Sequence, residues 1–200
     1  MARPARPSDY DAIADPYCYP DTTVLVNIPG IRDAAGLARF EVISTTQRSD
    51  EPLPRGVLSV RHYRAVHHHL FQDVYAWAGK FRTVRLSKDE SAFCYPEHIA
   101  REMRTLFTGL RQQKQLRGLP TDVFTSKVAH FLATLNAIHP FREGNGRTQM
   151  TFLALLADQA GHPLVLERLE PNRFLAVMIR SFHGDERPLV AEIHRILETH

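Results

Sequence analysis

The chain has 200 residues, 44% of them hydrophobic and 24% charged, a composition that is globular and excludes a fibrous or wholly disordered chain. Its length predicts one domain. The formal net charge is +3 without a run of like charges, so we expect no direct nucleic-acid partner. Two cysteines, Cys18 and Cys94, are too few for a disulfide framework or a thiolate zinc site.

The sequence also bears on localisation. No stretch of about 18 apolar residues occurs, which argues against a membrane-spanning helix. The N-terminal residues lack the apolar core of a secretory signal. We therefore expect a cytoplasmic protein without a membrane partner, and export as an effector by a specialised route stays open.

The first third of the chain predicts an arm and two helices. Residues 1–36 are rich in Pro, Asp and Gly and contain three tyrosines, which indicates an extended arm anchored by aromatic side chains. A first helix is predicted over about 33–47. From 59 to 71, apolar side chains recur at three- and four-residue steps, as on a helix face.

Residues 79–93 alternate with a period of two and predict a small β-hairpin, or flap, with a polar tip. A helix is predicted around residues 99–110, and four more helices follow it. The first of these begins after Thr121 as its N-cap, and the others span 145–160, 171–182 and 187–198. The fold class is mainly α, a helical bundle with one small hairpin. The predicted division is an arm and first helix at 1–54 and a domain at 55–200, with its core at 58–182.

One segment carries chemistry: the ten residues from His139 to Thr148, His-Pro-Phe-Arg-Glu-Gly-Asn-Gly-Arg-Thr. It forms a loop that opens onto a helix N-terminus. Gly144 and Gly146 remove Cβ atoms where the backbone must curl, so that N–H groups converge on an anion. The helix N-terminus adds partial positive charge, a site suited to phosphate.

The side chains of this segment fit phosphate chemistry. Arg147 can bind phosphate oxygens with its guanidinium. A carboxylate such as Glu143 suits an anionic pocket when Mg²⁺ joins it to the phosphates. His139 can accept a proton near neutral pH. Together these residues predict transfer of a nucleotide phosphate to a hydroxyl.

The segment resembles the signature of the Fic family (filamentation induced by cyclic AMP), His-x-Phe-x-Asp/Glu-Gly-Asn-Gly-Arg-x-x-Arg. The segments Leu70–Gly79 and Phe81–Phe93 are similar to further parts of that family, including its flap. The resemblance implies a Fic fold and a protein adenylyltransferase that moves AMP from ATP to a Tyr, Ser or Thr hydroxyl of a target protein.

Carried over to this chain, the resemblance makes His139 the base and Glu143 the Mg²⁺ ligand. Gly144, Asn145 and Gly146 would form the phosphate nest, Arg147 would contact the leaving phosphates, and Phe141 would pack into the core to hold the loop. The target would be held by the flap, whose tip consists of Ser87, Lys88, Asp89 and Glu90.

Met150 departs from the signature, because it stands where the second arginine of the family binds the terminal phosphate of ATP. Methionine has neither charge nor donor, so ATP would lose a charge-assisted contact worth about 1.5–3 kcal/mol. Three interpretations stay open: ATP bound more weakly or in another orientation, a different nucleotide donor, or an attenuated enzyme. A catalytically weak Fic fold that acts mainly as a binding partner is the competing hypothesis.

Many Fic proteins carry an inhibitory helix with the pattern Ser/Thr-x-x-x-Glu-Gly/Asn. No glutamate of this chain has Ser or Thr four positions before it. The chain therefore resembles the class that a small antitoxin inhibits in trans. That class includes bacterial toxins that modify type II topoisomerase subunits, and also secreted effectors, and nothing in the residues selects the target.

The consecutive histidines His67, His68 and His69 invite a metal interpretation. Neighbours on a helix point about 100° apart, so three of them cannot converge on one ion. We expect no metal site there. Trp77 is predicted to lie in the core at the start of the hairpin.

Overall fold

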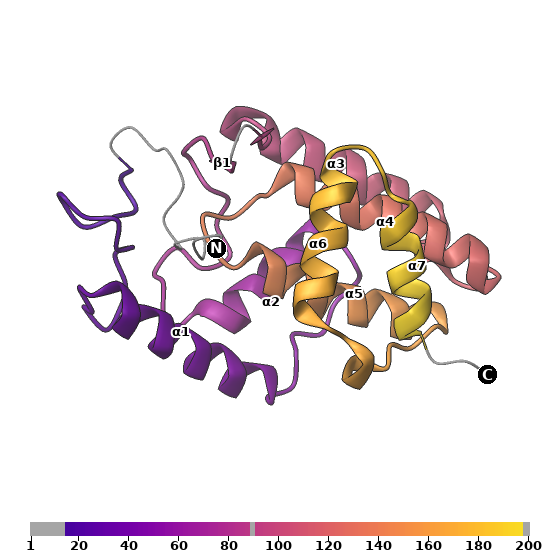
Figure 1. Ribbon diagram of the computed structural model, residues 1–200, viewed down its shortest axis with the longest axis horizontal. Helices are drawn as coiled ribbons and strands as arrows, with labels where there is room; N and C mark the ends of the chain where they lie inside the picture. The colour runs from indigo at the N-terminus through magenta and orange to yellow at the C-terminus, as the bar shows by residue number, and fades with distance from the viewer. Residues whose placement is uncertain (1–14, 89–90, 198–200) are drawn as a thin grey trace, which may run out of the picture.

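The computed structural model describes residues 15–88 and 91–197 and consists mainly of helices (Figure 1). The seven α-helices of these residues are α1 (Ala34–Ser49), α2 (Val60–Phe71), α3 (Pro96–Gln112), α4 (Thr121–Ile138), α5 (Asn145–Ala160), α6 (Pro171–Phe182) and α7 (Arg187–Ile196). Two short strands, β1 (Ser87–Lys88) and β2 (Ser91–Ala92), precede α3. Single 3₁₀ turns lie at η1 (Lys114–Leu116) and η2 (Leu166–Arg168). The predicted mainly α class is confirmed.

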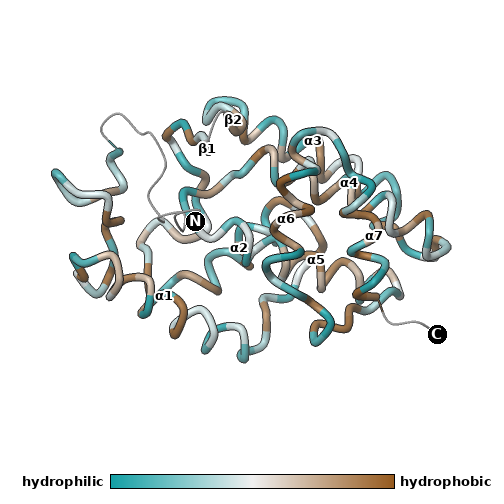
Figure 2. The backbone as a smooth tube through the Cα atoms, viewed as in Figure 1, coloured by the Kyte–Doolittle hydropathy of each residue, from teal (hydrophilic) through white to brown (hydrophobic). Residues whose placement is uncertain are grey.

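Helix α4 is the centre of the bundle and packs against α3, α5, α6 and α7. Half of its residues are buried and they point to several sides, as expected for a helix surrounded by others. On the other side of α5 lies α2, which in turn carries α1 (Figure 1). Apolar and polar residues alternate along the helices (Figure 2). Helix α1 differs from the others, because Ser44 and Thr45 are buried whereas Val42 and Ile43 are exposed.

Most helix boundaries follow the sequence signals. Helices α5 and α6 have the predicted limits, and Gly161 ends α5 in the left-handed conformation at φ 86°. The prediction for Thr121 is wrong by one residue: it is the first helical residue, and Pro120 occupies the N-cap without a side-chain hydrogen bond. Proline fixes φ near the value a helix needs, so it can precede the first turn without a polar cap.

The hairpin is much shorter than predicted. Ser87 pairs with Ala92 and Lys88 with Ser91, and residues 79–86 form no strand although their side chains alternate. At Arg82 the backbone bonds to another part of the chain instead, since its N–H donates to the carbonyl of Pro140. Asp89 and Glu90, half of the predicted tip, lie outside the described residues.

The described part of the N-terminal arm, from residue 15, lies against the body of the domain. Tyr17 meets Trp77 edge to face at 5.5 Å and hydrogen-bonds through its hydroxyl to Thr83, which agrees with an aromatic anchor. Trp77 itself is partly buried against the core. Cys18 and Cys94 are free thiols whose pKa values are raised, mainly by burial. No helix among the described residues is long and apolar enough to cross a membrane.

Candidate active site

The catalytic candidate His139 lies at the junction of α4 and the loop that follows. It is the C-cap of α4 in the left-handed conformation, with φ 47° and ψ 63°, and its N–H donates to the carbonyl of Leu135. Its ring stacks on that of Phe93, with 4.0 Å between the centroids. A non-glycine residue with positive φ is uncommon and is maintained only where its surroundings fix it. The packing around His139 therefore determines where its imidazole points.

Asn145 closes the loop on itself. Its side-chain oxygen accepts from the N–H of Phe141, and its side-chain nitrogen donates to the carbonyl of the same residue. Phe141 is fully buried, as expected, and its ring stacks on His67 at 3.7 Å. The side chain of Asn145 thus maintains the loop, and its part in a phosphate nest would rest on its backbone N–H.

His67 is a supporting residue that the sequence did not reveal. Its ring is buried, accepts from the N–H of Gly79 at Nδ1 and bonds through Nε2 to the carbonyl of Glu143. Burial lowers the pKa of His67 to about 3, so the ring is neutral and Nε2 is the donor. The available signal was its spacing: His67 follows the buried Tyr63 by four residues, which places both side chains on the inner face of α2.

The two glycines of the signature have different roles. Gly144 is the N-cap of α5 at φ 79°, and a Cβ there would lie 2.3 Å from Cζ of Phe71, so glycine is required. Gly146 is helical, and a Cβ there would meet no atom within 4 Å. The predicted reason for Gly146, a curled backbone, is therefore wrong. Its missing side chain leaves open space beside the first turn of α5.

The N-terminus of α5 has the features of an anion site. No side chain caps it, and no acidic residue lies in its first turn. Its first N–H groups lack intrahelical acceptors, and the helix dipole places partial positive charge there. Asn145 and Gly146 therefore have backbone N–H groups without intrahelical acceptors, whereas the N–H of Gly144 donates to the Glu143 side chain. The phosphate nest of Gly144, Asn145 and Gly146 stays a prediction.

Glu143 directly precedes Gly144, the N-cap of α5. One carboxylate oxygen accepts from the N–H of Gly144. Burial raises the pKa of the Glu143 carboxyl, and the nearby Glu41 raises it further. Among the described residues no group of three or more His, Cys, Asp or Glu side chains could hold a metal. A half-buried carboxylate that lines the cavity beside a phosphate site fits Mg²⁺, which commonly shares its shell with substrate phosphates and water.

Arg147 is turned toward α1. Its guanidinium forms an ion pair with Glu41, donates to the hydroxyl of Thr45 at 3.1 Å and lies over the ring of Phe71. It does not belong to the lining of the cavity described below. Contact between Arg147 and leaving phosphates stays a prediction.

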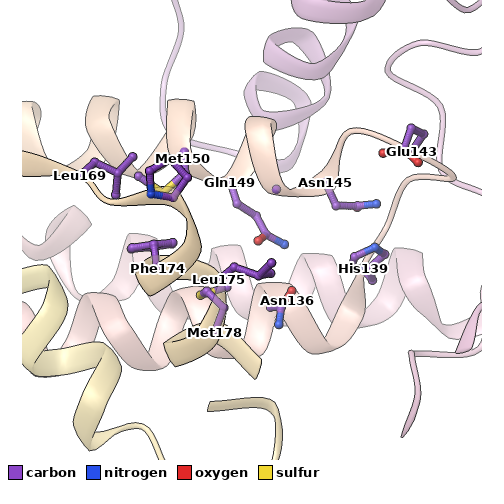
Figure 3. Close-up of a pocket in the computed structure, with 12 residues that line it drawn as sticks. Asn136, His139, Glu143, Asn145, Gln149, Met150, Leu169, Phe174, Leu175 and Met178 are labelled. Carbon is purple, nitrogen blue, oxygen red and sulfur yellow. The ribbon is translucent and has the colours of Figure 1, made fainter. Parts of the chain in front are cut away.

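A cavity of about 320 Å³ opens beside the loop, between α4, α5 and α6 (Figure 3). His139, Glu143, Asn145 and Gly146 line its polar end. The other end is mainly apolar and is lined by Met150, Leu169, Pro171, Phe174, Leu175 and Met178. Figure 3 shows the carboxamides of Gln149 and Asn136 between the two ends.

The short hairpin lies near His139. Phe93, which stacks on the His139 ring, directly follows β2, and Cys94 donates through its N–H to the carbonyl of Ala137 near the end of α4. Ser87 and Lys88 form β1 in the same hairpin. The structure therefore brings this segment to the edge of the candidate site.

Comparisons with known proteins agree with this geometry. Residues 57–157 match the model of the Fic/DOC family. A probable protein adenylyltransferase, y4lH of Sinorhizobium fredii, is 51% identical over 94% of this chain and 98% of its own length. The protein adenylyltransferase VbhT of Bartonella schoenbuchensis is 38% identical over 94% of this chain and 40% of its own. A Fic domain of a Bartonella quintana effector, solved with bound ADP, is 25% identical and superimposes with a TM-score of 0.81 over 91% of this chain and 94% of that one.

Proposed function

The chain belongs to the Fic/DOC family, and from that premise we propose that it is a protein adenylyltransferase that moves AMP from ATP to a hydroxyl side chain of a target protein. One observation carries the proposal. The imidazole of His139 and the uncapped N-terminus of α5 line the same cavity. A base and a phosphate site side by side suit phosphoryl chemistry, in which positioning and charge neutralisation dominate.

Each part of the site has a separate role in the transfer. Backbone N–H groups at Asn145 and Gly146, which line the cavity, bind phosphate oxygens of ATP. His139 takes the proton of the target hydroxyl, whose oxygen forms a bond to the α-phosphorus. The bond from that phosphorus to the β-phosphate oxygen breaks, and pyrophosphate leaves. Glu143 would hold Mg²⁺, which when bound neutralises phosphate charge.

Incubation with ATP labelled at the α-phosphate, Mg²⁺ and a bacterial lysate tests this function. The wild-type chain should label one or a few lysate proteins, and His139→Ala should label none. Mass spectrometry should find an adenosine monophosphate group on Tyr, Ser or Thr. Label that persists in His139→Ala, or the absence of label with the wild-type chain, would contradict the proposal.

A second candidate function is supported by Met150. Its thioether lines the cavity, and no Lys or Arg belongs to that lining among the described residues. A terminal phosphate of ATP beside Met150 would therefore meet no arginine or lysine side chain of this lining. A chain that uses another nucleotide donor, or one attenuated toward ATP, is consistent with this observation. Labelling with each nucleoside triphosphate and with nucleotide diphosphate conjugates separates these cases.

We further propose that the enzyme is the toxin of a toxin–antitoxin pair and that a small partner protein supplies the inhibitory helix in trans. The absence of the inhibitory pattern from the sequence supports this. The target would be presented along the hairpin that contains Ser87 and Lys88, and a type II topoisomerase subunit is one candidate. Expression of the wild-type chain in bacteria should arrest growth, whereas expression of His139→Ala should not.

A further inference from the structure

Arg82 is one of the most deeply buried side chains of the domain, with 2% of its surface exposed. Among the described residues its side chain donates to four backbone carbonyls. Its side chain donates to His139 at 2.8 Å, Ile138 at 3.3 Å, Cys94 at 2.6 Å and Val84 at 2.6 Å, and its own N–H donates to Pro140 at 2.9 Å. One residue therefore binds two segments that are far apart in the sequence.

The first segment is the end of α4 and the loop that begins there. Ile138 is the last residue of α4, and His139 is its C-cap. The last carbonyls of a helix have no intrahelical donors and carry partial negative charge. A guanidinium at this end satisfies two of these carbonyls and offsets their charge.

The second segment comprises the two ends of the hairpin. Val84 precedes β1, and Cys94 follows β2, so the guanidinium joins both ends of the hairpin to the base of the loop. Phe93, next to Cys94, is the residue whose ring stacks on His139. The backbones that carry the two stacked rings are thus held by the same side chain.

An arginine is suited to this position because its guanidinium offers five donors in a fixed planar arrangement. A lysine ammonium is a compact charge and cannot reach carbonyls on both sides with the same geometry. Four backbone carbonyls accept hydrogen bonds from this side chain, and these bonds explain why an arginine is buried in a segment whose sequence resembles an exposed strand.

We propose that Arg82 is a positioning residue for the transfer reaction: it fixes the His139 imidazole against Phe93 and keeps the hairpin in register with the catalytic loop. This inference rests on the proposed function, since it assigns the hairpin and His139 to one reaction. Arg82 does not line the cavity and so acts through His139 rather than on the nucleotide.

Two variants, Arg82→Met and Arg82→Lys, test the inference. At saturating ATP, the rate at which lysate proteins are labelled should fall at least about tenfold in Arg82→Met, because small misplacements of a reacting group are costly. The apparent KM for ATP should stay within about twofold, and ATP should still raise the melting temperature as in the wild type. Arg82→Lys should recover part of the rate.

A spectroscopic readout is independent of activity. In a proton NMR spectrum of the wild type, the ring proton of His139 that lies above the face of Phe93 should be shifted upfield. This resonance is assigned by its absence from the spectrum of His139→Gln. In Arg82→Met the resonance should move toward the position of an unstacked histidine. The control is Arg168→Met, which removes an arginine–carbonyl bond to Leu197 outside the site and should leave both rate and resonance unchanged.

The outcomes separate the two proposals. If the wild type labels nothing, the proposed function fails, and the histidine resonance still decides the role of Arg82. If Arg82→Met keeps the wild-type rate and resonance, or lowers only the melting temperature, Arg82 is a structural residue and the inference is wrong. If Arg82→Met does not fold, the same measurements on Arg82→Lys decide.

Discussion

Arg147, in the first turn of α5, is bound to Glu41 on α1 across 106 positions of sequence. The second carboxylate oxygen of Glu41 accepts from the hydroxyl of Tyr75. Helix α1 precedes the segment that matches the family model, which begins at residue 57. A signature residue is therefore held by a helix outside the region that defines the family.

This ion pair should contribute to stability. Glu41 is largely buried, and Glu41→Gln keeps its shape while removing its charge. We expect the variant to lose about 1–2 kcal/mol of unfolding free energy, measured by urea denaturation. In a double-mutant cycle with Arg147→Met, the coupling should be at least about 0.5 kcal/mol. Strictly additive effects would show that the pair is not formed in solution.

The two signature glycines should respond in opposite ways to alanine. Gly144→Ala introduces a Cβ into Phe71 at positive φ and should cost about 2–4 kcal/mol of unfolding free energy. Gly146→Ala meets no atom and should keep or raise stability by up to about 1 kcal/mol.

The methyl group of Gly146→Ala would nevertheless point into the space beside the phosphate site. We expect a loss of ATP affinity of about tenfold, or about 1.4 kcal/mol, measured by calorimetry. A Gly146→Ala protein that binds ATP as well as the wild type would remove Gly146 from the nucleotide site.

Met150→Arg should improve the use of ATP. The new guanidinium would lie at the cavity and supply a charge-assisted contact of about 1.5–3 kcal/mol to a terminal phosphate. The apparent KM for ATP should fall by about tenfold or more, whereas Met150→Leu, of similar volume and without charge, should resemble the wild type. An unchanged or lower rate in Met150→Arg would favour a donor other than ATP.

Acid should weaken the attachment of α7 to α6. Glu192 on α7 is almost fully buried and pairs with Arg195 and with Arg173 of α6, and the Arg195 hydrogen bond lowers its pKa. Below about pH 5 the Glu192 carboxylate binds a proton more readily in the unfolded chain than in the folded chain. The free energy of unfolding therefore decreases as the pH is lowered. The fall between about pH 5 and pH 3, followed by urea denaturation, should be shallower in Glu192→Gln. Equal slopes would contradict this role.

The local signals in the sequence predicted the helices and the loop well. Helical periodicity and the glycine at position 161 located α5, and four signature residues line one cavity: His139, Glu143, Asn145 and Gly146. These features depend on neighbours within a few residues, where spacing determines geometry.

The supporting contacts could not be predicted because they join distant residues. Arg82 bonds to His139 across 57 positions and His67 to Glu143 across 76. In the sequence, Arg82 is a charged residue in an alternating segment, and His67 belongs to a run of three histidines. Both patterns are typical of solvent-exposed residues, and only the tertiary fold buries these two side chains. The length of the hairpin was overestimated for the same reason, since the N–H of Arg82 donates to Pro140 and that of Thr83 to the hydroxyl of Tyr17.

The buried ion pair between Arg142 and Asp15 limits how far the chain can be trimmed. Both side chains are only 6% exposed, and they join the signature to the described start of the arm across 127 positions. A truncated protein cut at the borders of the family match would lose Asp15 and leave Arg142 buried without this carboxylate. The smallest folded and active version should therefore reach well upstream of residue 57.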